Sequence, residues 1–336
     1  MSNDVPTPGT PRDRRSFLTT LGGAALAASG ISALACATKA ATNGRESATT
    51  VPSPTATSTG AKIRPIGVQL YTVRDEMKRD VAATLARVAQ IGYTEVEFAG
   101  YFDHTPAEIR AMLDQNHLTA PSAHIPLQQL QGDMSGVIAA AKTIGHEYIT
   151  VPALIPPLMG KVADDFWSKT AAEFNRVGKA LKAEGIGFAY HNHNFEFVKL
   201  ADGRTGYDVL VAETDPAVVS FELDLLWATL AGQDPVALFA KNPGRYVMWH
   251  VKDVKGVDAA RTLATSTEGT AMQKLQKLSG SLAAVGTGDI DFRRIFAAAS
   301  TSGMRHFFVE NDSAPQTASS LADIETSYKN LRQMLA

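Results

Sequence analysis

Four apolar stretches of this chain end in residues that can bind a metal ion or transfer a proton. One of them, Ile186–Ala189, leads directly into Tyr190-His191-Asn192-His193-Asn194-Phe195-Glu196. The other three end in Asp224, His250 and Glu310. In a parallel barrel the carboxyl ends of the strands meet at one mouth, where side chains from distant positions can share a divalent ion. The pattern therefore predicts a metal site at such a mouth.

The elements that must position these residues alternate between strand and helix patterns. Continuous apolar runs, typical of strands buried on both faces, are Pro65–Tyr71, Thr94–Phe98, Leu118–His124, Tyr148–Pro152, Gly187–His191, Val219–Asp224, Tyr246–Val251 and Arg305–Glu310. Helical patterns are Val81–Ile91, Pro106–Asn116, Asp164–Glu184, Asp208–Glu213, Asp234–Ala240, Phe292–Ser302 and Leu321–Leu335. This alternation predicts an α/β protein with a (β/α)8 TIM barrel. A doubly wound open sheet is the second possibility, but no glycine-rich phosphate loop follows the first strand.

Local signals support the helix boundaries. Thr105 and Glu108 form the pattern of a capping box at the start of the 106–116 helix. Gly92 and Gly303 each follow a helical pattern, where a left-handed cap favours glycine. The polar segment Val257–Ala284 is expected to be an irregular insertion that lies over the mouth.

The first 36 residues are predicted to be an export signal. Arg14 and Arg15 precede a weakly apolar segment, 21–34, which is too short to span a bilayer comfortably. A small-residue cleavage pattern then leads into Cys36, the only cysteine of the chain. Two alternatives stay open, namely ordinary cleavage after Ala35 and a lipoprotein whose Cys36 carries a membrane anchor. Both predict twin-arginine export to the periplasm.

Composition divides the rest of the chain. Residues 37–61 are rich in Ser, Thr, Ala, Pro and Gly, so they cannot bury enough apolar surface to order themselves and are predicted to be a disordered linker. Residues 62–336 have the size of one barrel domain. The formal net charge of −2 gives no signature of nucleic-acid binding and argues against an endonuclease. A single cysteine excludes an intramolecular disulfide framework.

The body, residues 63–335, resembles the sugar phosphate isomerase/epimerase family, which has a xylose isomerase-like TIM barrel. The matching motifs are Gly67-Val68-Gln69-Leu70-Tyr71-Thr72-Val73-Arg74, Tyr93-Thr94-Glu95-Val96-Glu97-Phe98, Ser122-Ala123-His124, Glu222-Leu223-Asp224-Leu225-Leu226-Trp227, His250-Val251-Lys252-Asp253, Gly286-Thr287-Gly288-Asp289-Ile290-Asp291-Phe292 and Val309-Glu310. They join the Tyr-His-Asn-His segment in the family's order and at barrel spacing.

The resemblance implies one divalent ion, with manganese expected first and zinc, magnesium or cobalt as alternatives. The family holds it with Glu, Asp, His and Glu, and Asp224, His250 and Glu310 match three of these positions. At the fourth position this chain has His191, and Glu196 follows a few residues later. Both remain candidates, and Glu196 is favoured.

The chemistry implied is removal of a proton beside a carbonyl, which gives an enediolate that a metal ion stabilises. Epimerisation, isomerisation and elimination share this intermediate. The expected catalytic residues are Glu196, Glu310, Lys252 and His124. The expected substrate-binding residues are Gln69, Glu97, His193 and Trp227, the last of which replaces a family histidine and is expected to stack on a sugar.

An exported enzyme would rarely meet phosphorylated sugars. The predicted partner is therefore a small non-phosphorylated keto-sugar or keto-glycoside. The alternative function is a non-catalytic sugar-binding lipoprotein on a degenerate barrel.

Overall fold

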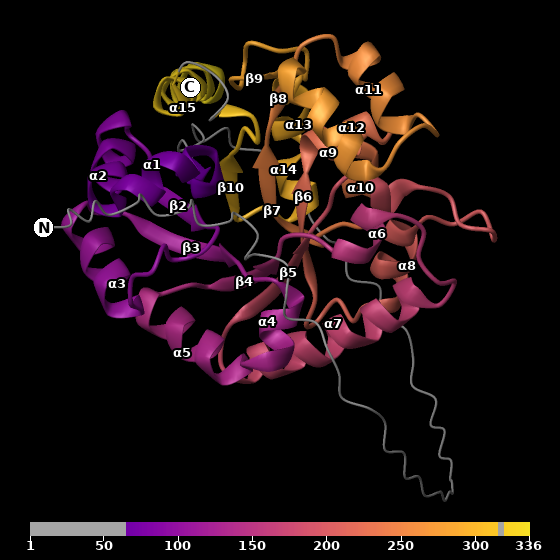
Figure 1. Cartoon of the computed structure of the whole chain (residues 1–336), viewed down its shortest axis with the longest axis horizontal. Coiled ribbons are helices and arrows are strands. Elements are labelled where there is room, and N and C mark those ends of the chain that lie inside the picture. The colour runs from indigo at the N-terminus through magenta and orange to yellow at the C-terminus, as the bar shows by residue number, and fades with distance from the viewer. Residues whose placement is uncertain (1–64, 315–318) are drawn as a thin grey trace, which may run out of the picture. The chain divides into compact units, whose positions relative to one another are not determined.

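The computed structural model describes residues 65–314 and 319–336, and these contain a closed parallel barrel surrounded by helices (Figure 1). Its strands are β1 Gly67–Gln69, β2 Glu95–Phe98, β3 Thr119–His124, β4 Tyr148–Val151, β5 Gly187–His191, β6 Ser220–Asp224, β7 Tyr246–Val251 and β10 His306–Val309. Each strand pairs in parallel with the next, and β10 pairs with β1 to close the ring. The predicted (β/α)8 barrel and its strands are confirmed.

The helices follow the predicted alternation. They are α1 Arg74–Arg79, α2 Val81–Ile91, α3 Pro106–Gln115, α4 Leu127–Gly132, α5 Met134–Ile144, α6 Ile155–Met159, α7 Phe166–Ala183, α8 Gly206–Glu213, α9 Leu225–Leu230, α10 Pro235–Lys241, α11 Val257–Thr265, α12 Ala271–Leu278, α13 Phe292–Ala297, α14 Ala299–Ser302 and α15 Ser320–Leu335. Short 3-10 turns are η1 Leu70–Val73, η2 Phe195–Phe197 and η3 Ser279–Ser281. Several helices were not predicted, among them α4 and α5 between β3 and β4, α1 after η1, and α9 directly after β6.

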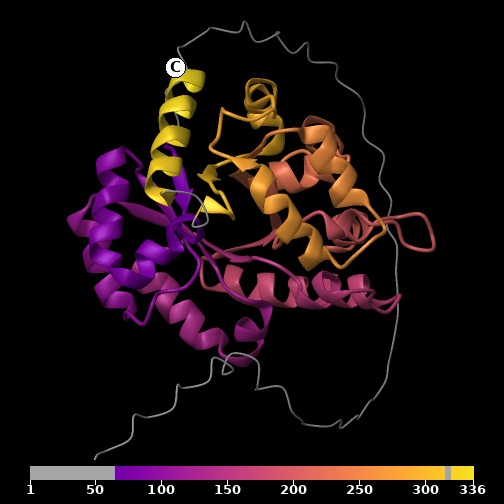
Figure 2. The same cartoon turned by 45° about the horizontal axis from the view of Figure 1, so that its top comes forward.

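Local chemistry sets the ends of these helices as expected. The Thr105 hydroxyl accepts a hydrogen bond from the Glu108 backbone, and the Glu108 carboxylate accepts one from the Thr105 N–H, which completes the capping box of α3. Gly92 and Gly303 adopt left-handed conformations after α2 and α14. The last helix, α15, packs beside α2 (Figure 2). The Tyr93 hydroxyl donates to the carbonyl of Ile324. These contacts join the first and the last elements of the barrel.

The insertion after β7 differs from its prediction. Instead of an irregular segment, residues 253–283 form α11, α12 and a two-stranded antiparallel sheet of β8 Asp253–Val254 and β9 Leu282–Ala283. These elements share a small apolar cluster that includes Leu226, Trp227 and Leu278. We call this region the cap. Trp227 belongs to the cap cluster and also borders a cavity at the carboxyl ends of the strands. The packing of the cap therefore affects the shape of that cavity.

The predicted export signal (1–36) and linker (37–61) lie outside the described residues. Across residues 65–314 and 319–336, no helix combines the length and apolar character needed to cross a membrane.

The Asp253 carboxylate fixes the loop that leads from the cap to α13. It accepts hydrogen bonds from the backbone N–H groups of Val254, Gly286 and Gly288, at 2.9 Å each. Gly288 approaches so closely that a Cβ atom there would lie 2.3 Å from Asp253 Oδ1. The loop therefore requires glycine at this position because of space.

We predict that Gly288→Ala lowers the free energy of unfolding by about 1–3 kcal/mol, the usual cost of overpacking a close contact. Chemical denaturation monitored by circular dichroism measures the loss. Gly132→Ala is the matched control, because a Cβ there meets nothing within 4 Å. Equal stability of the two variants would contradict this account of the loop.

Candidate active site

A cavity of about 970 Å³ opens at the carboxyl ends of the strands. Its deeper wall contains residues from several strand ends, namely His124, His191, His193, Trp227, Lys252, Glu310 and Asp312. Its outer wall contains residues from neighbouring loops and the cap, namely Tyr71, Arg74, Tyr101, Gln129, Gln276 and Ser279. The cap therefore borders the mouth, and the cavity lies where TIM barrels place their ligands.

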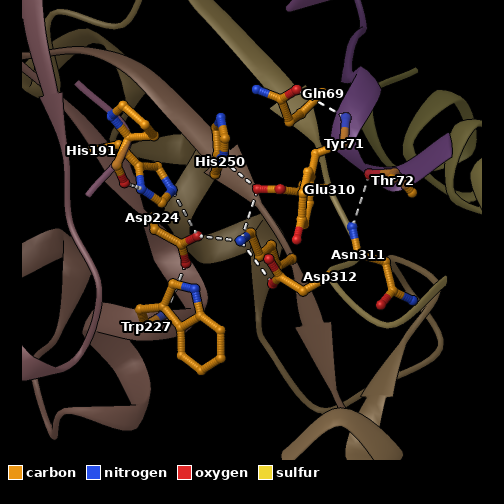
Figure 3. A network of polar contacts seen from close by, with 12 residues as sticks. Gln69, Tyr71, Thr72, His191, Asp224, Trp227, His250, Glu310, Asn311 and Asp312 are labelled. Atoms are coloured by element: carbon orange, nitrogen blue, oxygen red, sulfur yellow. Dashed lines mark hydrogen bonds and ion pairs between the residues drawn. The ribbon is translucent and has the colours of Figure 1, made fainter. Parts of the chain in front are cut away.

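A first cluster of possible metal ligands includes two residues of this wall, His191 and Glu310. One side-chain atom from each of His191, Asp224, His250 and Glu310 lies within 4.8 Å of the others, and all four residues are buried (Figure 3). They come from the ends of β5, β6, β7 and β10, as the strand pattern predicts. Glu196 is not part of this group.

The geometry of His191 suits a ligand. Its Nδ1 lies 3.0 Å from the carbonyl of Pro152, which can only accept, so Nδ1 carries the hydrogen. Burial, together with the neighbouring His250, lowers the pKa of His191 well below its usual value. Its Nε2 is then an unprotonated acceptor that faces Asp224 Oδ2 at 3.2 Å. Two acceptors at this distance favour a cation between them.

A second cluster lies on the inner side of His250. The Nε2 atom of His250 is 2.6 Å from Glu97 Oε2 and 3.2 Å from Glu222 Oε2, and His124 Nε2 is 2.8 Å from the same Glu222 oxygen. Gln69 donates to Glu97 at 2.7 Å. The two inner carboxylates therefore hold the Nε2 hydrogen of His250. Its Nδ1 faces Glu310 Oε2 at 2.6 Å.

These contacts set the protonation of the histidines. Burial alone would lower the pKa of His250, but Glu222, Glu310 and Glu97 outweigh it and raise that pKa well above its usual value. The same balance, with Glu97 and Glu222 as partners, raises the pKa of His124. His124 therefore favours the protonated form although it borders the cavity.

His193 has the opposite character. Burial and the neighbouring His191 lower its pKa well below the usual value. Its Nδ1 has no hydrogen-bond partner among the described residues. The ring stacks on Phe195, with centroids 5.3 Å apart, and lies 6.0 Å from the Trp227 ring at a 20° angle. His193 is thus a neutral imidazole held in a fixed orientation at the cavity wall.

Lys252 lies between three carboxylates at the cavity wall. Its Nζ is 3.1 Å from Asp224, 2.8 Å from Glu310 and 2.9 Å from Asp312. Burial alone would lower its pKa, but Asp224, Asp312 and Glu310 raise that pKa well above the usual value. Glu310 responds in the opposite direction, because Lys252 and His250 overcome the effect of burial and lower its pKa well below the usual range. Glu310 is therefore a stable anion and a weak base.

Glu196 lies apart from the predicted metal ligands. Its carboxylate accepts a hydrogen bond from the Tyr190 hydroxyl at 2.5 Å and another from the His193 N–H at 2.9 Å. Its side chain does not border the cavity. The structure groups His191, rather than the favoured Glu196, with Asp224. The Glu196 carboxylate instead holds the turn that presents His193.

The other predicted substrate-binding residues divide into two groups. His193 and Trp227 border the cavity, and the Trp227 indole nitrogen is buried and has no hydrogen-bond partner among the described residues. Gln69 and Glu97 are fully buried and do not border the cavity, and Glu97 contacts both Gln69 and His250.

Two residues that complete the clusters, Glu222 and Asp312, were not predicted. Glu222 lies two positions before Asp224, and Asp312 lies two positions after Glu310. Side chains two positions apart on a strand share a face. This periodicity points to Glu222, which shares β6 with Asp224, but gives no signal for Asp312, which lies in a turn beyond the end of β10 at Val309.

The donor set of the first cluster fits a divalent metal ion. Two imidazoles and two carboxylates are ligands that zinc and manganese accept, and the unprotonated Nε2 of His191 lacks a hydrogen for Asp224. The His250 ring also has the hydrogen-bonded rear nitrogen that is typical of metal-binding histidines.

Comparisons with known proteins agree with the barrel. The family model of the xylose isomerase-like TIM barrel matches residues 85–334 of this chain. An inosose dehydratase of Lacticaseibacillus casei is 25% identical over 230 residues, or 63% of this chain and 75% of that protein. A sugar phosphate isomerase/epimerase structure from Parabacteroides distasonis has a TM-score of 0.66 at 22% identity, over 85% of this chain and all of the other.

A structure of the IolI protein with a bound zinc atom has a TM-score of 0.61 at 12% identity, over 81% of this chain and 98% of the other. At such identities the solved structures establish the fold alone. The resemblance inferred from the motifs is confirmed.

The buried Glu196 predicts a pH dependence of stability. Burial raises its pKa from 4.5 to about 8. The folded chain therefore holds a proton that the unfolded chain releases between these values, so stability falls as pH rises from about 4.5 to about 8. We predict that Glu196→Gln removes this loss, which is on the order of a few kcal/mol.

The measurement is denaturant unfolding of both proteins at pH 5.5 and pH 8.5. The variant should gain stability relative to the unsubstituted protein as the pH rises. A constant difference between them, or a change of the opposite sign, would show that Glu196 is ionised throughout.

Proposed function

Because the chain belongs to the xylose isomerase-like TIM barrel family, we propose that it is a carbon–oxygen lyase acting on a keto-sugar or keto-glycoside. The observation that carries the proposal is a pair of cavity histidines in opposite surroundings: His124 Nε2 lies 2.8 Å from Glu222 and 3.2 Å from Glu97, which raise its pKa, whereas His193 stacks on Phe195 and burial lowers its pKa. Two groups whose environments push their pKa values apart are the usual sign of an acid and a base. The dehydratase name of the Lacticaseibacillus relative supports elimination.

His193 is the proposed base. It borders the cavity, burial lowers its pKa so that the ring is neutral, and stacking on Phe195 fixes the direction of the ring. It removes the proton on the carbon beside the keto group, and that electron pair forms the new double bond as the oxygen substituent leaves the next carbon. Water is lost from a free keto-sugar, and an alcohol or sugar is lost from a keto-glycoside.

His124 is the proposed acid. Glu97 and Glu222 stabilise its positive charge, and its ring lies 5.3 Å from that of His191, which in turn lies 5.0 Å from His193. The acid and the base thus stand on either side of His191 at the cavity wall. His124 donates its proton to the departing oxygen, which balances the proton taken by His193.

His191, Asp224, His250 and Glu310 are the proposed ligands of one divalent ion, which when bound supplies Lewis acidity to the substrate carbonyl. Zinc and manganese both suit this donor set, and the zinc of IolI supports such a site. Glu310 is assigned to binding rather than to proton transfer, because Lys252 and His250 keep it anionic.

The remaining cavity residues are suited to hold a sugar. The Trp227 ring borders the cavity and can stack on a sugar face, and the Lys252 ammonium can donate to substrate oxygens. A volume of about 970 Å³ lies at the upper end of the range for small-molecule sites. This size supports a substrate larger than a single small sugar, such as a keto-glycoside.

We predict that the zinc- or manganese-loaded protein, incubated with a keto-glycoside in heavy water, releases the alcohol or sugar and leaves an unsaturated ketone. His193→Gln should lower this rate by about 10²–10⁴-fold, as expected for loss of a general base. Proton NMR follows both the product and deuterium entry beside the ketone.

Removal of the metal with a chelator should abolish the reaction, and Tyr207→Phe, a change remote from the cavity wall, is the matched control. Deuterium entry without release would indicate epimerisation or isomerisation and would contradict the lyase. Absence of both, in a protein that holds metal and binds the sugar, would favour the sugar-binding lipoprotein.

We also propose that residues 1–36 direct twin-arginine export and that the body acts in the periplasm. Replacing both Arg14 and Arg15 with lysine is predicted to retain the chain in the cytoplasm, as measured by cell fractionation. Mature protein outside the cytoplasm despite this change would exclude the route. Cys36→Ala distinguishes ordinary cleavage after Ala35 from a lipoprotein anchored through Cys36, because only the lipoprotein would lose its membrane association.

A further inference from the structure

The Lys252 ammonium occupies a position that concerns the proposed metal site directly. It contacts Asp224 Oδ2 and Glu310 Oε2, both of which belong to proposed metal ligands. Its third partner, Asp312 Oδ2 at 2.9 Å, belongs to a residue that borders the cavity and is outside the ligand cluster. Figure 3 shows the carboxylates of Asp224, Glu310 and Asp312 pointing toward one another.

An ammonium and a divalent ion cannot share the same two oxygens without strong repulsion between like charges. Asp224 Oδ1 accepts the Trp227 N–H at 2.8 Å and caps α9, so Oδ2 is the oxygen of Asp224 that faces both His191 and Lys252. Glu310 Oε2 also faces His250 at 2.6 Å. A metal ion that binds these two oxygens, Asp224 Oδ2 and Glu310 Oε2, would therefore compete with Lys252 for both of them.

Asp312 is the partner that can hold it. Arg74 donates to the Asp312 carbonyl at 2.9 Å, and the Asn311 N–H donates to the Thr72 hydroxyl at 3.1 Å. These contacts tie the segment after β10 to the segment after β1, so the Asp312 carboxylate has a fixed place beside the ammonium. Its side chain is 31% exposed, whereas that of Lys252 is 2% exposed. It therefore lies on the cavity side of Lys252.

We propose that Asp312 is a positioning residue that holds the Lys252 ammonium on the cavity side, so that a divalent ion can bind Asp224 and Glu310. The same contact directs the ammonium toward substrate oxygens. The inference rests on the metal-dependent function proposed above. It adds that Lys252 competes with the metal ion for two ligand oxygens and that the Asp312 carboxylate limits this competition.

The test is a double-mutant cycle on metal affinity, measured with Zn²⁺ and with Mn²⁺ in competition with a fluorescent chelator. Asp312→Asn should weaken binding by about 10- to 100-fold, the usual effect of a residue behind the ligands, because Lys252 then pairs only with Asp224 and Glu310. Lys252→Met should tighten binding. In the Lys252→Met background, Asp312→Asn should change the affinity less than threefold.

The cycle separates positioning from simple charge. If Asp312→Asn weakens binding equally in both backgrounds, Asp312 acts only as a nearby negative charge, and the inference fails. Asp258→Asn removes an exposed charge of the cap, 91% exposed, and should leave affinity unchanged. Asp312→Glu keeps the carboxylate and should retain affinity within tenfold of the unsubstituted protein.

Two further results distinguish this inference from the proposed function. If the unsubstituted protein binds metal and Asp312→Asn has no effect, the positioning role alone is overturned. If the unsubstituted protein binds neither ion, the metal-dependent function and this inference are overturned together. Circular dichroism confirms folding of each variant, and Lys252→Gln repeats the cycle should Lys252→Met be unfolded.

Discussion

The balance of buried charge around His250 is the constraint on which this site depends. Glu97 and Glu222 on the inner side and Glu310 on the outer side all approach its ring, and none of them is exposed enough for water to stabilise its charge. Buried carboxylates need cations or hydrogen-bond donors close by. His250 supplies both of its nitrogens, and His124 and Lys252 supply the remaining positive charge. Removing one partner would leave another uncompensated in the barrel.

This constraint explains why hydrogen bonds hold the loops at the mouth of the barrel in place. The cluster works only if strand ends that are distant in sequence stay within hydrogen-bond reach. Asp253 holds the loop beyond the cap, Glu196 holds the turn that carries His193, and Arg74 with Thr72 joins the two sides of the closure between β1 and β10. Each contact is a carboxylate, hydroxyl or guanidinium satisfying backbone groups of a loop. Some polar residues near the site therefore belong to the proposed catalytic and metal-binding groups, and others hold the backbone of the surrounding loops.

The sequence allowed the barrel to be predicted because its strands are buried on both faces and appear as continuous apolar runs. Asp224, His250 and Glu310 could be located for the same reason, since each ends such a run. The position of Glu196 could not be predicted, because the 3-10 turn η2 directs its carboxylate back toward Tyr190 and the His193 N–H. The helices of the cap escaped prediction because they are short and polar, and their apolar partner Trp227 comes from another part of the chain.

At the corner of the proposed metal site where the family resemblance implies a glutamate, this chain has His191, and this difference changes the charge balance of the site. A neutral imidazole at this corner leaves Asp224 and Glu310 as the anionic ligands, so a divalent ion would bring these groups to neutrality. The Lys252 ammonium would then be an excess positive charge in a buried place, and Asp312 balances it. A family member with a glutamate at this corner would carry one more negative charge, and a lysine there could balance it without a partner. Asp312 and His191 are therefore expected to act together, since the loss of one ligand charge makes the restraint of Lys252 necessary.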